Sequence, residues 1–129
     1  MLGAVWSSAL PALLFDGAFR VLDLNRSCAE LLGMPSAALL GTELLQLQPS
    51  EDHEPSRQAS EQTWRQAAAG HAPPPMRCRV RDASGQLRWW ALTVLHLPAT
   101  ASQPRVPERW LALVHDESGA HAEIGRAHV

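Results

Sequence analysis

Cysteine and histidine side chains offer the widest chemistry in this sequence, since thiolates act as nucleophiles and both residue types bind metals. Cys28 and Cys78 are the two cysteines of the 129-residue chain. Two are too few for a disulfide scaffold and are typical of a reducing, cytoplasmic compartment. The histidines do not gather into a ligand set, because His96 and His115 lie on predicted strands and face opposite ways. We therefore expect no metal site.

Acidic side chains cluster at one place, where Glu51, Asp52 and Glu54 precede Pro55. This pattern is typical of a solvated helix start, because proline suits the first turn and carboxylates suit the positive end of the helix dipole. Neither a Gly-x-Ser-x-Gly elbow nor a phosphate-binding loop occurs in the sequence. The sequence therefore predicts no catalytic residues and no enzyme.

The composition indicates one globular domain of ordinary size. Hydrophobic residues make up 46% and charged residues 19% of the chain, which suits a packed core and not a disordered chain. The formal net charge of −2 argues against a nucleic-acid partner. No apolar run in this segment approaches the ~20 residues of a membrane span. Residues 1–10 carry no basic side chain, unlike a secretory signal.

Turn, cap and breaker residues divide the chain into sheet pieces at both ends with helices between them, which favours an α+β fold with an antiparallel sheet. The expected elements are a flanking helix over 1–10, a hairpin over 12–24 turning at Asp16-Gly17 with its second strand from Phe19, a helix from the N-cap Asn25 to Gly33, helical turns at 37–40 and 43–47, a helix from Pro55 to Ala69, strands at 76–81, 87–97 and 109–115, and a final helix over 119–129.

Two of these strands carry clear burial patterns. Met76, Cys78 and Val80 alternate with arginines, so the apolar residues are predicted to face a core and the arginines the opposite side. From Trp89 onward the 87–97 strand is apolar on both faces, which is typical of a strand covered on both sides. We expect a terminal helix or a second subunit to cover its outer face.

Five tryptophans and no tyrosine are unusual for a domain of this size. Trp64 lies on the longest predicted helix, whose apolar face is thin and otherwise consists of Ala67 and Ala68. We therefore expect this helix to be the most mobile. Trp64, Trp90 and Trp110 either fill the core or converge on an aromatic-lined ligand pocket, and both interpretations stay open.

The order and spacing of the elements resemble the PAS domain over residues 11–118. The loop from Ala99 to Glu108 departs from that pattern, because it is longer and richer in proline than the usual hairpin there. The resemblance is carried by short motifs in the usual order, namely Asp16-Gly17, Asn25 with Leu31-Leu32-Gly33, Leu39-Leu40-Gly41, Leu47 before Pro49, Arg79-Val80-Arg81-Asp82 with Gly85, Arg88-Trp89, and Asp116-Glu117-Ser118. The last of these motifs is similar to the Asp-x-Ser/Thr signature that joins such domains to a signalling helix.

The resemblance implies a five-stranded antiparallel sheet with short helices packed on one face and a small-molecule cavity between sheet and helices. Placement by spacing then directs a set of apolar side chains into this interior. The predicted pocket residues are Phe15, Cys28, Trp64, Cys78, Val80, Trp90, Leu92, Trp110 and Val114.

Two cofactors of the family fit these residues poorly. Light-sensing relatives carry a reactive cysteine in the short helix after the Leu-Gly step, and here that position is near Leu44. Haem-binding relatives use a histidine on the long helix, whereas here His53 and His71 only flank it. The sequence therefore argues against flavin and haem, and it leaves the identity and even the existence of a ligand open.

The resemblance implies a sensory and dimerisation module of a bacterial signalling protein. We expect a homodimer that senses a small molecule in an apolar pocket and relays the signal through terminal helices. Residues 119–129 are predicted to start a C-terminal signalling helix that leads to an output domain, such as a histidine kinase, a diguanylate cyclase or a transcription regulator. Two alternatives stay open, a ligand-free dimerisation scaffold and a small α+β cone isomerase or dehydratase. The lack of an acidic residue at the predicted inward-facing strand positions argues against the enzyme.

Overall fold

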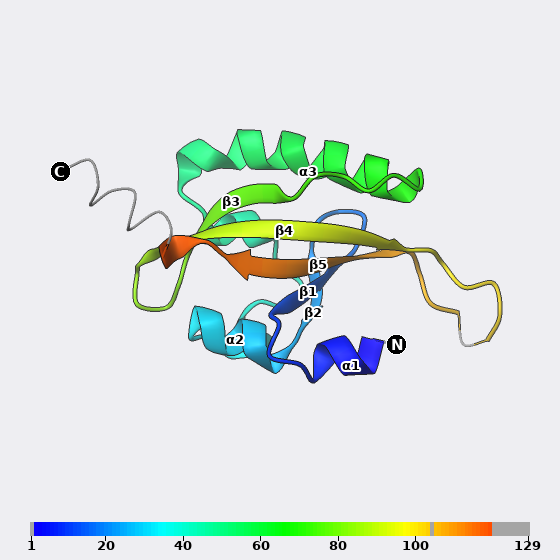
Figure 1. Ribbon diagram of the computed structural model, residues 1–129, viewed down its shortest axis with the longest axis horizontal. Helices are drawn as coiled ribbons and strands as arrows, with labels where there is room; N and C mark the ends of the chain where they lie inside the picture. The colour runs from blue at the N-terminus through cyan, green and yellow to red at the C-terminus, as the bar shows by residue number, and fades with distance from the viewer. Residues whose placement is uncertain (1, 104, 120–129) are drawn as a thin grey trace.

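The computed structural model describes residues 2–103 and 105–119 of the chain. Their five strands form one antiparallel sheet in the spatial order β2-β1-β5-β4-β3 (Figure 1), which confirms the predicted α+β architecture. The elements are α1 (Leu2–Trp6), β1 (Ala12–Phe15), β2 (Val21–Leu24), α2 (Arg26–Leu32), the short 3-10 helices η1 (Ser36–Ala38), η2 (Leu44–Leu47) and η3 (Ser50–Asp52), α3 (His53–Ala68), β3 (Met76–Arg81), β4 (Leu87–Leu97) and β5 (Arg109–Asp116).

Strand β3 follows the predicted alternation. Cys78 and Val80 are buried, whereas Arg77 and Arg81 are exposed. Cys78 pairs with Trp90 of β4, and paired residues share one face of a sheet. The apolar side chains of β3 and β4 therefore join the same core cluster as the inner residues of the other three strands.

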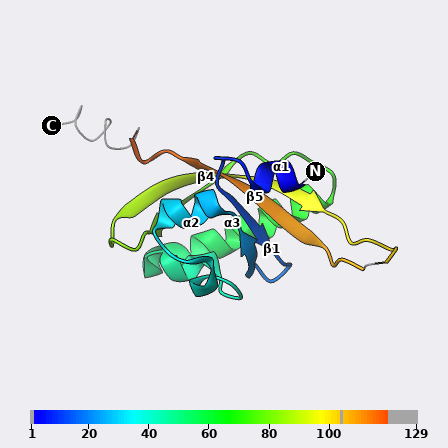
Figure 2. The same ribbon diagram turned by 90° about the horizontal axis from the view of Figure 1, so that it is seen from below.

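Helices α2 and α3 cover this inner face. The side chain of Asn25 accepts a hydrogen bond from the amide of Cys28 and caps α2 as predicted. Gly33 ends the helix with φ of 68°, a left-handed conformation that glycine adopts without strain. Buried side chains of α2 and α3 belong to the inner core cluster, whereas α1 lies beside β1 and β5, as Figure 2 shows.

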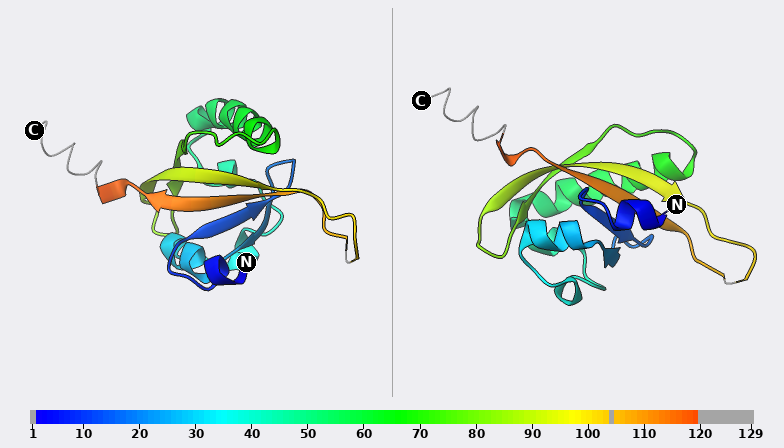
Figure 3. Two further views of the ribbon diagram at one scale, coloured as in Figure 1. Left: turned by 45° about the vertical axis from the view of Figure 1, so that its right-hand side comes forward. Right: turned by 60° about the horizontal axis from the view of Figure 1, so that its bottom comes forward.

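The outer face of the sheet is covered in part. Val5 and Trp6 at helix α1 pack against the outer side chains of β1 and β5, and Figure 3 shows this helix beside those strands. The helix ends at Trp6 and is shorter than predicted. Farther along β4, Trp89 and Leu95 are 36% and 46% exposed. Among the described residues, the predicted covering by a terminal helix is therefore present over β1 and β5, where α1 packs.

The first hairpin differs from the prediction at its turn. β2 begins at Val21 and not at Phe19, which lies in the turn with φ of 67°. The Asp16 carboxylate accepts hydrogen bonds from two backbone amides of this turn, both at 2.9 Å, and so holds a turn wider than two residues. Val21 and Leu24 are both buried, so burial does not alternate along β2, because the β1–β2 register shifts at the turn end of β1.

Helix α3 begins two residues earlier than predicted, at His53 instead of Pro55. Proline is tolerated at this third position because the first four amides of a helix have no intrahelical acceptor. Ala68 is exposed and does not anchor the helix, whereas Thr63 is buried beside Trp64. All the buried residues of α3 therefore lie in its C-terminal half.

Two further predictions concern the ends of the chain and the membrane. Within the described residues, no helix is both long enough and apolar enough to cross a bilayer. The helix predicted over 119–129 lies outside the described residues, apart from Gly119.

Candidate functional site

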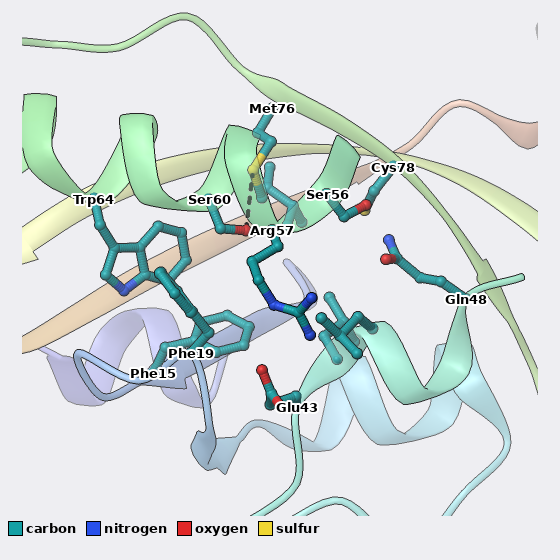
Figure 4. Close-up of a pocket in the computed structure, with 13 residues that line it drawn as sticks. Phe15, Phe19, Glu43, Gln48, Ser56, Arg57, Ser60, Trp64, Met76 and Cys78 are labelled. Carbon is teal, nitrogen blue, oxygen red and sulfur yellow. Dashed lines mark hydrogen bonds between the residues drawn. The ribbon is translucent and has the colours of Figure 1, made fainter. Parts of the chain in front are cut away.

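A cavity lies between the inner face of the sheet and the α3 and η2 segments (Figure 4). Its volume is about 40 Å³, which is room for a few water molecules. The lining is mostly apolar, with a small number of polar side chains. It consists of Phe15, Phe19, Glu43, Leu44, Leu45, Gln48, Ser56, Arg57, Ser60, Trp64, Met76, Cys78 and Leu92.

The predicted pocket residues divide into two groups in the structure. Phe15, Trp64, Cys78 and Leu92 line the cavity. The other five are buried in the surrounding core but are not part of the lining, namely Cys28, Val80, Trp90, Trp110 and Val114.

Aromatic rings form one end of the cavity. The rings of Phe15 and Phe19 meet the Trp64 indole edge to face, with centroids 5.4 Å and 5.2 Å away. Trp110 stacks on Trp64 at 6.0 Å and donates its Nε1–H to the Trp64 carbonyl. The Trp64 indole in turn donates to the carbonyl of Asp16 at 3.1 Å. These contacts fix the indole that walls the cavity.

Trp90 does not join this aromatic cluster. It pairs with Asp116 of β5, whereas Trp110 pairs with His96 of β4. The two tryptophans are therefore separated by six residues along β4, roughly 20 Å at the rise of a β-strand. Of the three tryptophans, Trp64 alone lines the cavity; Trp110 stacks on it from the core, and Trp90 fills the core elsewhere.

Polar groups gather at the other end, where Gln48 and Cys78 lie together in Figure 4. Gln48 is only 8% exposed, and its Oε1 has no hydrogen-bond partner among the described residues. Burial raises the pKa of Cys78 to about 12, against a smaller lowering by a hydrogen bond from Gln48. Burial likewise raises the pKa of Cys28 to about 12. Both thiols are therefore protonated and poorly nucleophilic at neutral pH.

Several lining residues were missed by the sequence analysis although one signal was present. Ser56, Ser60 and Trp64 recur every four residues, so they share one face of a helix. The Ser60 hydroxyl reaches the Met76 sulfur at 3.7 Å, as Figure 4 shows. Starting from Trp64, the helical period would have placed both serines in the cavity. No comparable signal pointed to Gln48.

An ion pair outside the cavity ties the start of α3 to β3. Arg79 donates Nε–H and Nη2–H to the two carboxylate oxygens of Asp52, each at 2.8 Å. The hydrogen bond from Arg79 lowers the pKa of Asp52. Arg79 also lies 5.6 Å from the Trp89 ring centroid. Asp52 is therefore not the solvated helix-start carboxylate of the prediction, because an arginine of the neighbouring strand holds it.

A second polar network fixes the end of β5. Arg88 contacts the carboxylates of Asp82 and Asp116 at 3.0 Å and 3.1 Å. Hydrogen bonds from Ser84 are the main cause that lowers the pKa of Asp82. The Asp116 carboxylate also accepts from the Ser118 amide, and the Ser118 hydroxyl accepts from the Trp89 amide. The Asp116-Glu117-Ser118 segment is therefore tied to β4.

The described residues contain no group of three or more His, Cys, Asp or Glu side chains arranged to hold a metal ion. His53, which the sequence analysis expects just outside the long helix, lies at the first position of α3. Its Nε2 donates to the carbonyl of Gln48 at 3.1 Å.

Solved structures of other proteins share this architecture. A PAS domain from Colwellia psychrerythraea superimposes with a TM-score of 0.70 at 14% identity, over 92% of this chain and 94% of that one. A PAS domain from a two-component sensor histidine kinase gives 0.63 at 13% identity, over 88% and 90%. The Rhodobacter sphaeroides LOV protein gives 0.69 at 15% identity, over 89% of this chain and 64% of that one.

These likenesses concern the fold, since all three identities are low. Among curated proteins, a sequence search finds none that matches the chain. A family profile described as PAS fold, however, matches residues 6–121. The chain therefore belongs to the PAS family.

Proposed function

We propose that this PAS domain senses a small molecule in the cavity between α3 and the sheet and relays its presence through the end of β5. The observation that carries the proposal is a mostly apolar cavity in which a buried polar atom, Gln48 Oε1, has no partner among the described residues. PAS domains are sensory signalling modules, and a mostly apolar cavity with few convergent polar groups is the usual form of a ligand site.

The packing of α3 supports a signal that begins at this helix. Its buried residues lie in its C-terminal half, whereas its start is held by the Asp52–Arg79 ion pair. A ligand in the cavity contacts both the helix and the sheet. If α3 has two positions relative to the sheet, the ligand favours the one that it binds more tightly. The shift in their populations is limited by the difference in its affinity for them.

The polar network at the end of β5 supports the route by which the signal leaves. Arg88 of β4 joins Asp82, in the turn after β3, to Asp116 at the end of β5. Arg77 of β3 also pairs with Glu117 at 3.1 Å. A shift of β3 relative to β4 therefore strains contacts that hold the segment after β5.

A cavity-filling variant tests the proposal. Ser60→Phe fills the cavity, and Gln58→Phe on the exposed face of the same helix is the matched control. A small-molecule library is screened by thermal unfolding, because a ligand that binds the folded state raises Tm. Compounds that stabilise the wild type and Gln58→Phe should fail to stabilise Ser60→Phe. The proposal is contradicted if the compounds stabilise all three proteins equally. It is also contradicted if no compound stabilises the wild type and native mass spectrometry finds no co-purified small molecule.

A ligand-free dimerisation scaffold is the second candidate, and the small cavity volume favours it. About 40 Å³ is well below the roughly 300–1,000 Å³ of ordinary ligand pockets. The same native mass spectra separate the candidates, since a scaffold carries no ligand.

We also propose a homodimer, in a cytoplasmic bacterial signalling protein with an output domain beyond this segment. The outer-face residue Leu95, which is 46% exposed, supports a second copy on this face. One of the similar structures is a PAS domain of a two-component sensor histidine kinase, which makes such a kinase one candidate output. In sedimentation equilibrium, Leu95→Arg should weaken dimerisation and Leu22→Arg, on the exposed side of β2, should not. A monomeric wild type rejects the dimer.

A further inference from the structure

We propose that Gln48 is the polar anchor of the cavity, which takes a small neutral molecule with a planar apolar body and one N–H or O–H donor directed at Gln48 Oε1. This inference rests on the proposed ligand-sensing function and specifies the chemical class of the ligand.

The backbone holds Gln48 in place from both sides. Its amide donates to the Leu45 carbonyl at 3.0 Å, and its own carbonyl accepts from the His53 ring at 3.1 Å. The side chain, 8% exposed, extends into the cavity toward Cys78 (Figure 4). A contact fixed in this way is preorganised, so a ligand does not have to order it.

The two ends of the Gln48 amide have different surroundings. The NH₂ group of the amide is not among the buried polar atoms that lack a partner. Oε1 is left without a partner among the described residues. Buried acceptors without partners are rare and costly. A ligand donor at this position, or a water molecule when the ligand is absent, satisfies Oε1.

The remaining lining sets the charge and shape of the ligand. Arg57 and Glu43 both line the cavity, so the site offers no net charge to an ionic ligand. Arg57 is also paired with Glu54 at 3.5 Å. At the other end, Trp64 and the two phenylalanines that contact it offer ring faces and edges that suit a planar apolar body.

The volume sets the size. About 40 Å³ admits only a few non-hydrogen atoms without rearrangement. Met76 and Arg57 are long lining side chains with several rotatable bonds, so a change of rotamer at either residue would make room for a larger molecule. The smallest aromatic rings are therefore the appropriate probes.

Pyrrole and furan form a matched pair, because the two rings differ chiefly in a donor N–H against an acceptor oxygen. Both are titrated into the full chain and followed by the ¹³Cδ resonance of Gln48 and the backbone amides. Pyrrole should bind about fivefold more tightly than furan, the discrimination given by one hydrogen bond to a buried acceptor. Only pyrrole should shift the Gln48 ¹³Cδ resonance strongly.

Gln48→Met removes the acceptor at similar length, and Gln46→Met is the control at an exposed position of η2. The pyrrole preference should disappear in Gln48→Met and persist in Gln46→Met. If Gln48→Met does not fold, the inference is still tested by the pyrrole and furan titrations of the wild type and by the shift of its Gln48 ¹³Cδ resonance. The inference is overturned if the wild type binds pyrrole and furan equally, if it binds furan more tightly, or if the pyrrole preference survives in Gln48→Met. These outcomes leave the proposed ligand sensing intact. Binding of neither probe to the wild type overturns this inference, and failure of the library screen as well overturns the proposed function.

Discussion

The two halves of α3 are attached to the sheet by different forces. The C-terminal half buries Thr63, Trp64 and Ala67, and Trp64 adds a hydrogen bond to Asp16 and three ring contacts. The N-terminal half buries no residue. It is held by polar contacts instead: the ion pair that its N-cap residue, Asp52, makes with Arg79, the hydrogen bond from His53 to Gln48, and the contact of Ser60 with Met76.

This difference explains how one helix can serve both stability and sensing. Apolar and aromatic packing carries no charge that salt screens or pH titrates, so it keeps the C-terminal half in place. A partly exposed ion pair contributes little and is screened by salt. The cavity borders both halves, since Ser56 and Trp64 line it. Its wall is therefore firm at the aromatic end and adjustable near Ser56.

Removing the aromatic anchor should have the largest effect. Trp64→Ala is expected to lower the free energy of unfolding by about 3–5 kcal/mol, the usual cost of deleting a buried indole. Trp64→Phe keeps a ring and loses the hydrogen bond to Asp16, so its loss should be smaller. Denaturant unfolding measures both variants. An unchanged stability in Trp64→Ala would show that the indole does not hold the helix.

Acid should weaken the attachment of the N-terminal half by removing the Asp52–Arg79 ion pair. Because Arg79 lowers the pKa of Asp52 below its ordinary 3.8, the ion pair stabilises the fold above that pH and is lost as the pH falls through the folded-state pKa. Asp52→Asn should therefore be less stable than wild type near neutral pH, and the difference should vanish in acid. Unfolding curves between about pH 6 and about pH 2 measure this difference. A difference that persists unchanged at the acid end contradicts the assignment.

Glu54→Gln is the matched control for this series. Glu54 lies at the same helix start, but its contact is a 3.5 Å pair with the exposed Arg57. Its stability difference from wild type should be small throughout the pH range.

The smallest effect should appear in thiol labelling. Cys78 lines both the cavity and an outer groove that Asp52 and Arg79 border. Cys28 lies on the buried side of α2, in the core. Both thiols should react slowly with iodoacetamide, since burial raises each pKa to about 12. Asp52→Asn should accelerate labelling of Cys78 several-fold and leave Cys28 unchanged. Mass spectrometry of Cys28→Ser and Cys78→Ser backgrounds separates the two sites. Equal acceleration of both thiols would indicate global unfolding instead.

Local patterns were sufficient to predict most of the sheet and the cap of α2. The alternation around Cys78 and Val80 identified β3 and its buried face, and Asn25 and Gly33 marked the ends of α2. The first turn was predicted less well. Phe19 occupies a left-handed conformation that glycine normally takes, and hydrogen bonds that the Asp16 carboxylate accepts from the amides of Ala18 and Arg20 stabilise that turn.

The cavity was harder to predict because tertiary contacts decide its lining. Apolar character identified Phe15, Trp64, Cys78 and Leu92 but could not separate them from core residues such as Trp90. Gln48 is polar and sits before a proline, a pattern that predicts a surface loop. Its burial depends on β3 and α3 closing over it, which no local spacing encodes.

Residue-resolved amide hydrogen exchange of the wild-type chain tests the unequal attachment of α3 most directly. Residues 57–61 and 64–68 all lie beyond the first helical turn, so both sets have intrahelical hydrogen bonds. The amides of 57–61 should exchange faster than those of 64–68, and Asp52→Asn should accelerate only the first set. Uniform protection along α3, or equal acceleration of both sets, would contradict an adjustable N-terminal half.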